Sequence, residues 1–150
     1  MQDSWLGLTD AADLGRIVWR LGAAAVLGGS IGIEREFARK AAGLRTHMTV
    51  SLACAAFVLL EIESGGAHED VSRVIQGIAA GIGFLGAGTI LKKESEEQIQ
   101  GLTTAATIFL TAAVGAAAGA GHVGIGLVCV VGAWLILTLI AGIERAVSRR

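Results

Sequence analysis

Residues 102–142 have the sequence LTTAATIFLTAAVGAAAGAGHVGIGLVCVVGAWLILTLIAG, which contains no Asp, Glu, Lys or Arg. A membrane-spanning helix needs about 20 consecutive apolar residues, so this stretch is long enough for two. Its midpoint is marked by Gly121 and His122. We therefore predict two membrane-spanning helices, at about 102–120 and 123–142, which are joined by a tight turn.

Three further apolar windows precede this pair, at about 17–33, 48–62 and 74–91. The 150-residue chain is 53% hydrophobic and only 17% charged, and its mean hydropathy is +0.67. Soluble domains usually carry about 25% charged residues, so the composition indicates an integral membrane protein or an unusually apolar subunit. Because the apolar runs do not alternate with polar residues, a β-barrel is excluded. We predict an all-α membrane protein, a single domain with five transmembrane helices.

The positive charges are distributed unequally between the two sides of the membrane. Segments 34–47, 92–101 and 143–150 hold nine of the twelve Lys and Arg residues, and all three fall on one side if each window crosses once. Basic loops stay in the cytoplasm, so we predict an outside N-terminus and a cytoplasmic C-terminus. The acidic start of the chain is unlike a signal peptide. A short interfacial helix around Trp5 is one interpretation of that start, and a loose polar terminus is the other.

The third window is rich in glycine. Gly81, Gly83 and Gly86 match the spacing of a dinucleotide-binding turn, but no strand precedes them and the surroundings are apolar, so we reject that function. Small residues in membrane helices let neighbouring helices approach closely. We interpret five glycines as helix-packing positions: Gly77, Gly81, Gly83, Gly86 and Gly88. The alternative is a broken helix whose freed carbonyls line a polar cavity.

A second notable segment, residues 34–47, packs six charges into one short connection. It is either a solvated helix end or a docking or ligand surface. For the second interpretation the candidate residues are Glu34, Arg35, Glu36, Lys40, Arg45 and Thr46. Thr46 is also expected to cap the start of the second helix, because threonine is a common N-cap.

The opposite side carries acidic residues close to Arg73. Magnesium prefers one or two carboxylates and retains several waters, so Asp70 is a candidate metal ligand, although an ordinary solvated loop would look the same. Arg20 lies one turn inside the outer end of the first helix. A charge there must pair or extend towards water, and Glu61 or Glu63 is the expected partner.

Other polar residues give no sign of catalysis. Thr103 and Thr104 lie at the start of the fourth helix, where hydroxyls usually bond to their own backbone, so packing competes with a functional role. The three histidines lack metal-ligand spacing, and no nucleophile–histidine arrangement is recognisable. We expect no enzyme and no certain cofactor. The net charge of −1 gives no reason to expect a nucleic-acid partner.

Four stretches together resemble the MgtC/SapB family of bacterial inner-membrane proteins. They are GGSIGIERE at 28–36, KAAGLRTH at 40–47, QGIAAGIGFLGAGTI at 76–90 and GLTTAA at 101–106. The resemblance implies a five-span membrane domain that takes part in Mg²⁺ homeostasis, adaptation to low Mg²⁺ and, in pathogens, virulence. It also implies regulation of other membrane proteins, including the proton-driven ATP synthase.

Two departures from the family pattern are visible. Asp70 and Arg73 correspond to a family Asp-Pro-x-Arg pattern, but Val71 stands in place of the proline. Longer family members carry a soluble cytoplasmic domain after the fifth helix, whereas this chain stops at Arg150. We expect a function that needs that domain to be absent or supplied by another protein.

Three functions are compatible with these features. The first is a regulator that acts in the lipid bilayer through the 34–46 surface and the glycine faces, as a homo-oligomer, because so small a bundle can bury few of its glycine grooves alone. The second is a Mg²⁺ or cation transporter with Asp70 and Gln76 at its outer mouth, glycine carbonyls in the middle and Glu34 or Glu36 at its exit. The third is a membrane scaffold.

Overall fold

The computed structural model describes residues 11–92, 99–140 and 142. It contains five long helices: α1 (Ala11–Phe37), α2 (Leu44–Glu63), α3 (His68–Gly88), α4 (Leu102–Gly119) and α5 (Val123–Leu135), which a π-helical turn (Ile136–Ile140) prolongs. By length and composition, all five could cross a membrane. The predicted all-helical membrane fold with five helices is thereby confirmed. The segment around Trp5 lies outside the described residues, so its interfacial helix stays a prediction.

One element was not predicted. Strands β1 (Leu91–Lys92) and β2 (Ile99–Gln100) form a two-residue antiparallel pair between α3 and α4. The pair extends beyond the helices, where backbone groups can reach water, and so does not conflict with the rule that only helices and closed barrels cross hydrocarbon.

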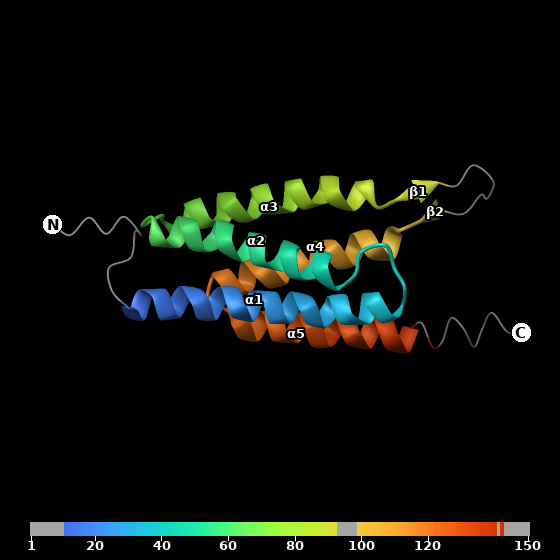
Figure 1. The fold of residues 1–150 in the computed structure, drawn as a ribbon. Coiled ribbons are helices and arrows are strands. Elements are labelled where there is room, and N and C mark those ends of the chain that lie inside the picture. The colour runs from blue at the N-terminus through green and yellow to red at the C-terminus, as the bar shows by residue number, and fades with distance from the viewer. Residues whose placement is uncertain (1–10, 93–98, 141, 143–150) are drawn as a thin grey trace, which may run out of the picture.

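The five helices lie side by side and alternate in direction (Figure 1). The connection 38–43, the strand pair and the end of α5 lie at one end of the bundle, which we call the 38–43 end. The start of α1, the connection 64–67 and the α4–α5 turn lie at the other, the 64–67 end. The five alternating helices therefore place the start of α1 and the end of α5 at opposite ends.

Helix α4 forms the centre of the bundle and contacts each of the other four helices. One core cluster joins α4 to α1 and α5 through Leu27, Ile31, Val114, Val130 and Ala133. Another consists of Ala24, Ala55 and Ala118, one from each of α1, α2 and α4, and all three are fully buried. Helix α3 lies at the edge and is the least buried helix (Figure 1).

Glycines bring α1, α2 and α4 together. A Cβ atom at Gly115 would overlap the backbone carbonyl of Ser51, and one at Gly119 would lie 2.5 Å from the carbonyl oxygen of Ala55. On α1, a Cβ at Gly28 would lie 2.5 Å from the Cβ of Ser51. These contacts use the close approach that small residues four apart permit in membrane helices.

The glycines of α3 behave differently. Within the described chain, Gly77, Gly81, Gly83 and Gly88 have nothing within 4 Å of an added Cβ, whereas Gly86 faces Ala105 at 3.5 Å. Any close packing at those four positions would therefore involve something other than the described residues of this chain. Helix α3 is continuous from His68 to Gly88, so the alternative of a broken third helix is wrong.

Candidate functional site

Polar side chains are buried where α1, α2 and α4 meet. We call this group the polar column. Its members are 0–5% exposed and comprise Arg35 from α1, His47 and Ser51 from α2, and Thr104, Thr107 and Thr111 from α4. Ionisable residues inside a membrane bundle are costly to bury and usually have a function, so this column is the candidate functional site.

Local helix geometry builds the column. His47 and Ser51 are four residues apart, and the three threonines follow one another at intervals of three and four, so each set lies on one helix face. A Cβ at Gly32 would lie 3.0 Å from the Cβ of His47, which shows how closely α1 approaches this face of α2.

The entrance of the column lies at the 38–43 end. Arg35 Nη2 donates a hydrogen bond to Thr104 Oγ1 at 3.4 Å. Its Nη1 atom lies 3.6 Å from Glu34 Oε2, which makes a long ion pair. Arg35 Nε and Glu34 Oε2 are buried and have no hydrogen-bond partner among the described residues. The Arg35 guanidinium therefore links α1 to α4, but not all of its N–H groups have a hydrogen-bond partner among the described residues.

His47 lies deeper and is fully buried. Its Nδ1 atom is 2.9 Å from the carbonyl oxygen of Gly43. A carbonyl can only accept, so Nδ1 carries the hydrogen and, in the neutral ring, Nε2 is an acceptor. Nε2 is buried without a hydrogen-bond partner in the described part of the chain.

The inner part of the column is satisfied by backbone carbonyls. Ser51 Oγ donates to Ala24 O at 2.7 Å. Thr107 Oγ1 donates to Thr104 O at 2.9 Å, and Thr111 Oγ1 donates to Thr107 O at 2.8 Å. The buried layer of Ala24, Ala55 and Ala118 lies beyond these hydroxyls, in the direction of the 64–67 end. The column therefore has polar atoms without a hydrogen-bond partner among the described residues at its 38–43 end, and alanine methyl groups bound it at the other end.

The residues of the predicted 34–46 surface are partly buried and partly exposed in the structure. Arg35 is buried in the column and Glu34 is mostly buried beside it, whereas four other candidates are exposed: Glu36, Lys40, Arg45 and Thr46. Thr103 is exposed too, while its neighbour Thr104 is buried. Only part of the predicted surface can therefore contact a soluble partner directly.

The cap of α2 differs from the prediction. Gly43 is the N-cap residue and has no capping side chain. The Leu44 backbone N–H instead donates to Glu36 Oε2 at 3.1 Å, so the end of α1 caps the start of α2. The predicted cap by Thr46 is wrong, because Thr46 already lies inside the first turn and a capping side chain must precede it.

Asp70 and Arg73 lie at the 64–67 end, far from the column. Asp70 Oδ1 pairs with Arg73, and its Oδ2 accepts the Ala67 backbone N–H at 3.0 Å. Both oxygens thus stabilise the first turn of α3. Gln76 is exposed on the same helix. Within residues 11–92, 99–140 and 142, no group of three His, Cys, Asp or Glu side chains could hold a metal, so magnesium at Asp70 stays a prediction.

The expected partner of Arg20 is wrong. Arg20 Nη1 donates to the carbonyl oxygen of Gly119 at 3.1 Å, at the end of α4. Glu63 is instead paired with Arg16, whose Nη2 lies 3.1 Å from Glu63 Oε2. A cation near the last carbonyls of a helix is favourable, which explains why Arg20 caps α4 and does not reach towards the acidic loop.

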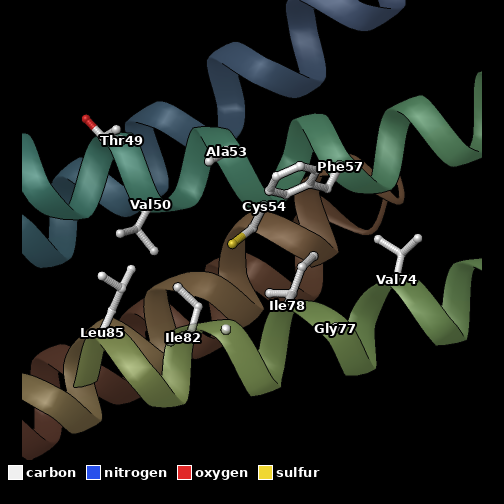
Figure 2. A pocket seen from close by; sticks show the side chains of 11 residues that line it. Thr49, Val50, Ala53, Cys54, Phe57, Val74, Gly77, Ile78, Ile82 and Leu85 are labelled. Atoms are coloured by element: carbon white, nitrogen blue, oxygen red, sulfur yellow. The ribbon is translucent and has the colours of Figure 1, made fainter. Parts of the chain in front are cut away.

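A second feature, an apolar groove of about 580 Å³, separates α2 from α3. Figure 2 shows Phe57 and the Cys54 sulfur on the α2 side, facing Ile78 and Ile82 on α3. The exposed glycines Gly77 and Gly81 also line it. Apart from the Thr49 hydroxyl and the Cys54 thiol the lining is apolar, so it can contact hydrocarbon or an apolar helix.

Sequence analysis missed four residues of the column: His47, Ser51, Thr107 and Thr111. The spacing of the threonines indicated that they share one helix face. His47 and Ser51 also share a face, but a histidine four residues from a serine in an apolar helix does not by itself indicate a particular function.

Comparison with known proteins identifies the family. A model described as the MgtC family matches residues 21–146. Protein SrpB of Synechococcus elongatus is 39% identical over 96% of this chain and 79% of its own length. Protein MgtC of Brucella abortus is 46% identical over 67% of this chain, and YhiD of Escherichia coli K12, whose name marks it as a candidate magnesium transporter, is 39% identical over 72%.

The chain covers 41% of the Brucella protein and 53% of YhiD. No solved structure matches it. The family match nevertheless includes four of the five helices completely and all of the polar column. The chain belongs to the MgtC family.

Proposed function

We propose that this chain is a non-enzymatic regulatory protein of the bacterial inner membrane that takes part in Mg²⁺ homeostasis and adaptation to low Mg²⁺ or virulence. It acts by binding other membrane proteins. Membership of the MgtC family and the magnesium-related name of one relative support the link to Mg²⁺. The partners proposed are the membrane part of the ATP synthase, another membrane protein or a second copy of the chain.

The exposed surface of α3 is the observation that carries this proposal. Phe84 is 82% exposed, and Gly77 and Gly81 have nothing within 4 Å of an added Cβ. Lipid gives little drive for helix association, so a partner helix binds mainly through close van der Waals packing. An edge helix with accessible glycines and large apolar side chains provides such a surface.

The proposed orientation places the 38–43 end in the cytoplasm. Its basis is the nine of twelve Lys and Arg residues in segments 34–47, 92–101 and 143–150. We expect alkaline phosphatase fused after Arg150 to be inactive and green fluorescent protein fused there to fluoresce. Insertion of the same reporters at Gly65, in the opposite connection, should reverse both results. Phosphatase activity after Arg150 would contradict this orientation.

Cation transport is the second candidate, because the buried Glu34 Oε2 atom has no hydrogen-bond partner in the described part of the chain. Two features oppose it. The Arg35 guanidinium lies 3.6 Å from that oxygen, and a fixed positive charge in a narrow path repels a divalent cation. The continuous α3 also keeps its carbonyls within the helix, so they do not form the proposed middle of the route.

A variant at the α3 surface tests the regulatory role. Gly81→Leu should abolish the support of growth in low Mg²⁺ at a normal protein level, because a Cβ at this exposed position has nothing within 4 Å among the described residues, while a leucine side chain blocks a close contact with a partner helix. Gly22→Leu is the matched control, since Gly22 is also an exposed helix glycine with nothing within 4 Å. Growth should be measured in a strain that depends on this protein.

Flux in liposomes separates regulation from transport. The purified chain should pass no more Mg²⁺ than empty liposomes, and Asp70→Asn should leave growth in low Mg²⁺ unchanged. Mg²⁺ flux that Asp70→Asn removes would establish the transport function instead. Normal growth with Gly81→Leu would show that the α3 surface is not the partner site.

A further inference from the structure

A polar hollow of about 490 Å³ lies at the 38–43 end of the bundle, between the end of α1 and the start of α2. Its lining residues are Glu36, Gly43, Leu44, Arg45 and Thr46. Glu36 and Arg45 are both exposed, and neither takes part in an ion pair among the described residues. Two opposite charges therefore line one hollow without neutralising each other.

Both charges are available to a bound molecule. Glu36 Oε2 accepts the Leu44 backbone N–H at 3.1 Å, while its Oε1 atom has no hydrogen-bond partner in the described part of the chain. The Arg45 guanidinium carries several N–H donors and suits phosphate or carboxylate oxygens. A molecule that satisfies both side chains has an ammonium group and an anionic group close together.

The hollow continues into the apolar groove between α2 and α3. Thr46 lines the hollow, and Thr49 and Val50, three and four residues further along α2, line the groove. Residues at these intervals lie on one helix face, so the two spaces follow each other along α2. The groove then runs past Cys54 to Phe57, with a volume of about 580 Å³ (Figure 2). A polar space at the end of the helix thus leads into an apolar one.

The groove is suited to an acyl chain. Helices α2 and α3 contact each other, and two of the groove's lining residues, Cys54 and Ile82, are only 3% and 8% exposed. A helix is about 10–12 Å across with its side chains, so it would lie over such a groove, whereas a single file of methylene groups can enter it. An acyl chain joined to a phosphate and an ammonium group is an aminophospholipid.

We propose that the hollow and the groove together bind one phospholipid with a phosphate and an ammonium group, such as phosphatidylethanolamine. The phosphate accepts hydrogen bonds from Arg45, the ammonium group donates to Glu36, and one acyl chain lies between α2 and α3. Because the hollow has one charge of each sign, it favours a headgroup with no net charge over an anionic one. Gly81 belongs both to the groove and to the face proposed for a partner helix, so the lipid is the occupant in the free chain.

Lipid binding to the full chain, purified in detergent, can be measured by native mass spectrometry. The probes are phosphatidylethanolamine, phosphatidylglycerol with the same acyl chains, and glycerophosphoethanolamine, which is the headgroup without acyl chains. We expect phosphatidylethanolamine to bind about tenfold more tightly than phosphatidylglycerol, the equivalent of one hydrogen bond to a charged group, and the headgroup alone not to bind. Equal affinity for the two lipids, or for the lipid and its headgroup, would overturn the proposal.

Glu36→Gln tests the ammonium contact. Glutamine keeps an oxygen for the Leu44 N–H but loses the charge, so this variant should bind the two lipids equally. Glu69→Gln is the matched control, since Glu69 is an exposed glutamate at the 64–67 end, and it should keep the wild-type preference. A preference that persists in Glu36→Gln would show that Glu36 does not select the headgroup and would overturn the proposal.

Ala53→Trp tests the groove. Ala53 is exposed and lines the groove, whereas Ala56, on the same helix, is exposed and does not. Tryptophan at position 53 should weaken the binding of phosphatidylethanolamine at least as much as the loss of the ammonium contact does, and Ala56→Trp should leave it unchanged. Equal binding by the two variants would contradict an acyl chain in the groove. If Ala53→Trp fails to fold, the wild-type lipid comparison and Glu36→Gln decide.

The same spectra report the other possible occupant. A dimer that binds no lipid, and that Ala53→Trp converts to a monomer, would show that a second copy of the chain fills the groove, and it would overturn the proposal. The lipid measurements use the isolated chain and do not depend on growth in low Mg²⁺. Failure of lipid binding is therefore distinguishable from failure of the regulatory role.

Discussion

Replacement of Gly115 with alanine is expected to lower the free energy of unfolding by about 3 kcal/mol, the upper end of the usual cost of overpacking. The added Cβ would overlap the carbonyl oxygen of Ser51 and lie 2.7 Å from its Cα. Both are backbone atoms, so no side-chain rotation relieves the clash. Helix α2 would have to move away from α4.

That movement is blocked on the other side of α2. A Cβ at Gly28 of α1 would lie 2.5 Å from the Cβ of Ser51 and 2.7 Å from the carbonyl oxygen of His47. Ser51 is therefore held between Gly28 and Gly115. Since interiors are packed at crystal-like density, a shift of α2 away from α4 presses it into α1.

Thermal unfolding in detergent and the amount of protein in the membrane are the measurements for Gly115→Ala. Gly22→Ala is the matched control, because Gly22 is an exposed helix glycine with nothing within 4 Å of an added Cβ. We expect it to equal or exceed the wild-type stability, since alanine favours helix over glycine by about 1 kcal/mol. Equal stability of Gly115→Ala and Gly22→Ala would contradict this account of the α2 contacts.

The number of helices could be predicted from the sequence because hydrocarbon imposes a simple requirement. Every backbone amide must be paired within the span, so a long apolar run in this chain must be helical. The stretch 102–142 shows this most clearly. The β1–β2 pair escaped prediction because it begins at the last residue of the third apolar window and continues beyond it, where no such requirement holds.

The packing glycines could not be chosen from the sequence. The third window holds the densest glycines, yet Gly77 and Gly81 meet nothing in the described chain, while Gly28 and Gly115 are in tight contact with α2. Four-residue spacing occurs in both sets. Which face of a helix is turned inwards depends on the helices that pack against it, and these cannot be identified from one sequence.

The same reason limits prediction of the site. Arg35 and Thr104 are 69 positions apart, so their hydrogen bond depends on how α1 and α4 are rotated. Arg20 shows a second limit. The rule that opposite charges pair predicted an acidic partner, but the acceptor is a backbone carbonyl at the end of α4, and every residue type has a backbone carbonyl, so the sequence does not reveal it.

Replacement of Arg35 with leucine is the second large effect we expect, a loss of about 3 kcal/mol in the free energy of unfolding. Removing one partner of a buried ion pair typically costs 3–5 kcal/mol, because the other charge is left uncompensated. Here that charge is Glu34, whose Oε2 is buried and whose nearest cationic atom is Arg35 Nη1 at 3.6 Å. The bond to Thr104 is lost as well.

Two further variants isolate the cause. Arg45→Leu removes an exposed arginine near the same end of the bundle and should have little effect. The double variant Glu34→Leu with Arg35→Leu should be more stable than Arg35→Leu alone, because it leaves no charge without a partner. If the double variant is less stable than the single one, the cost comes from lost packing of the Arg35 stem. If Arg35→Leu is as mild as Arg45→Leu, the guanidinium does not hold α1 and α4 together.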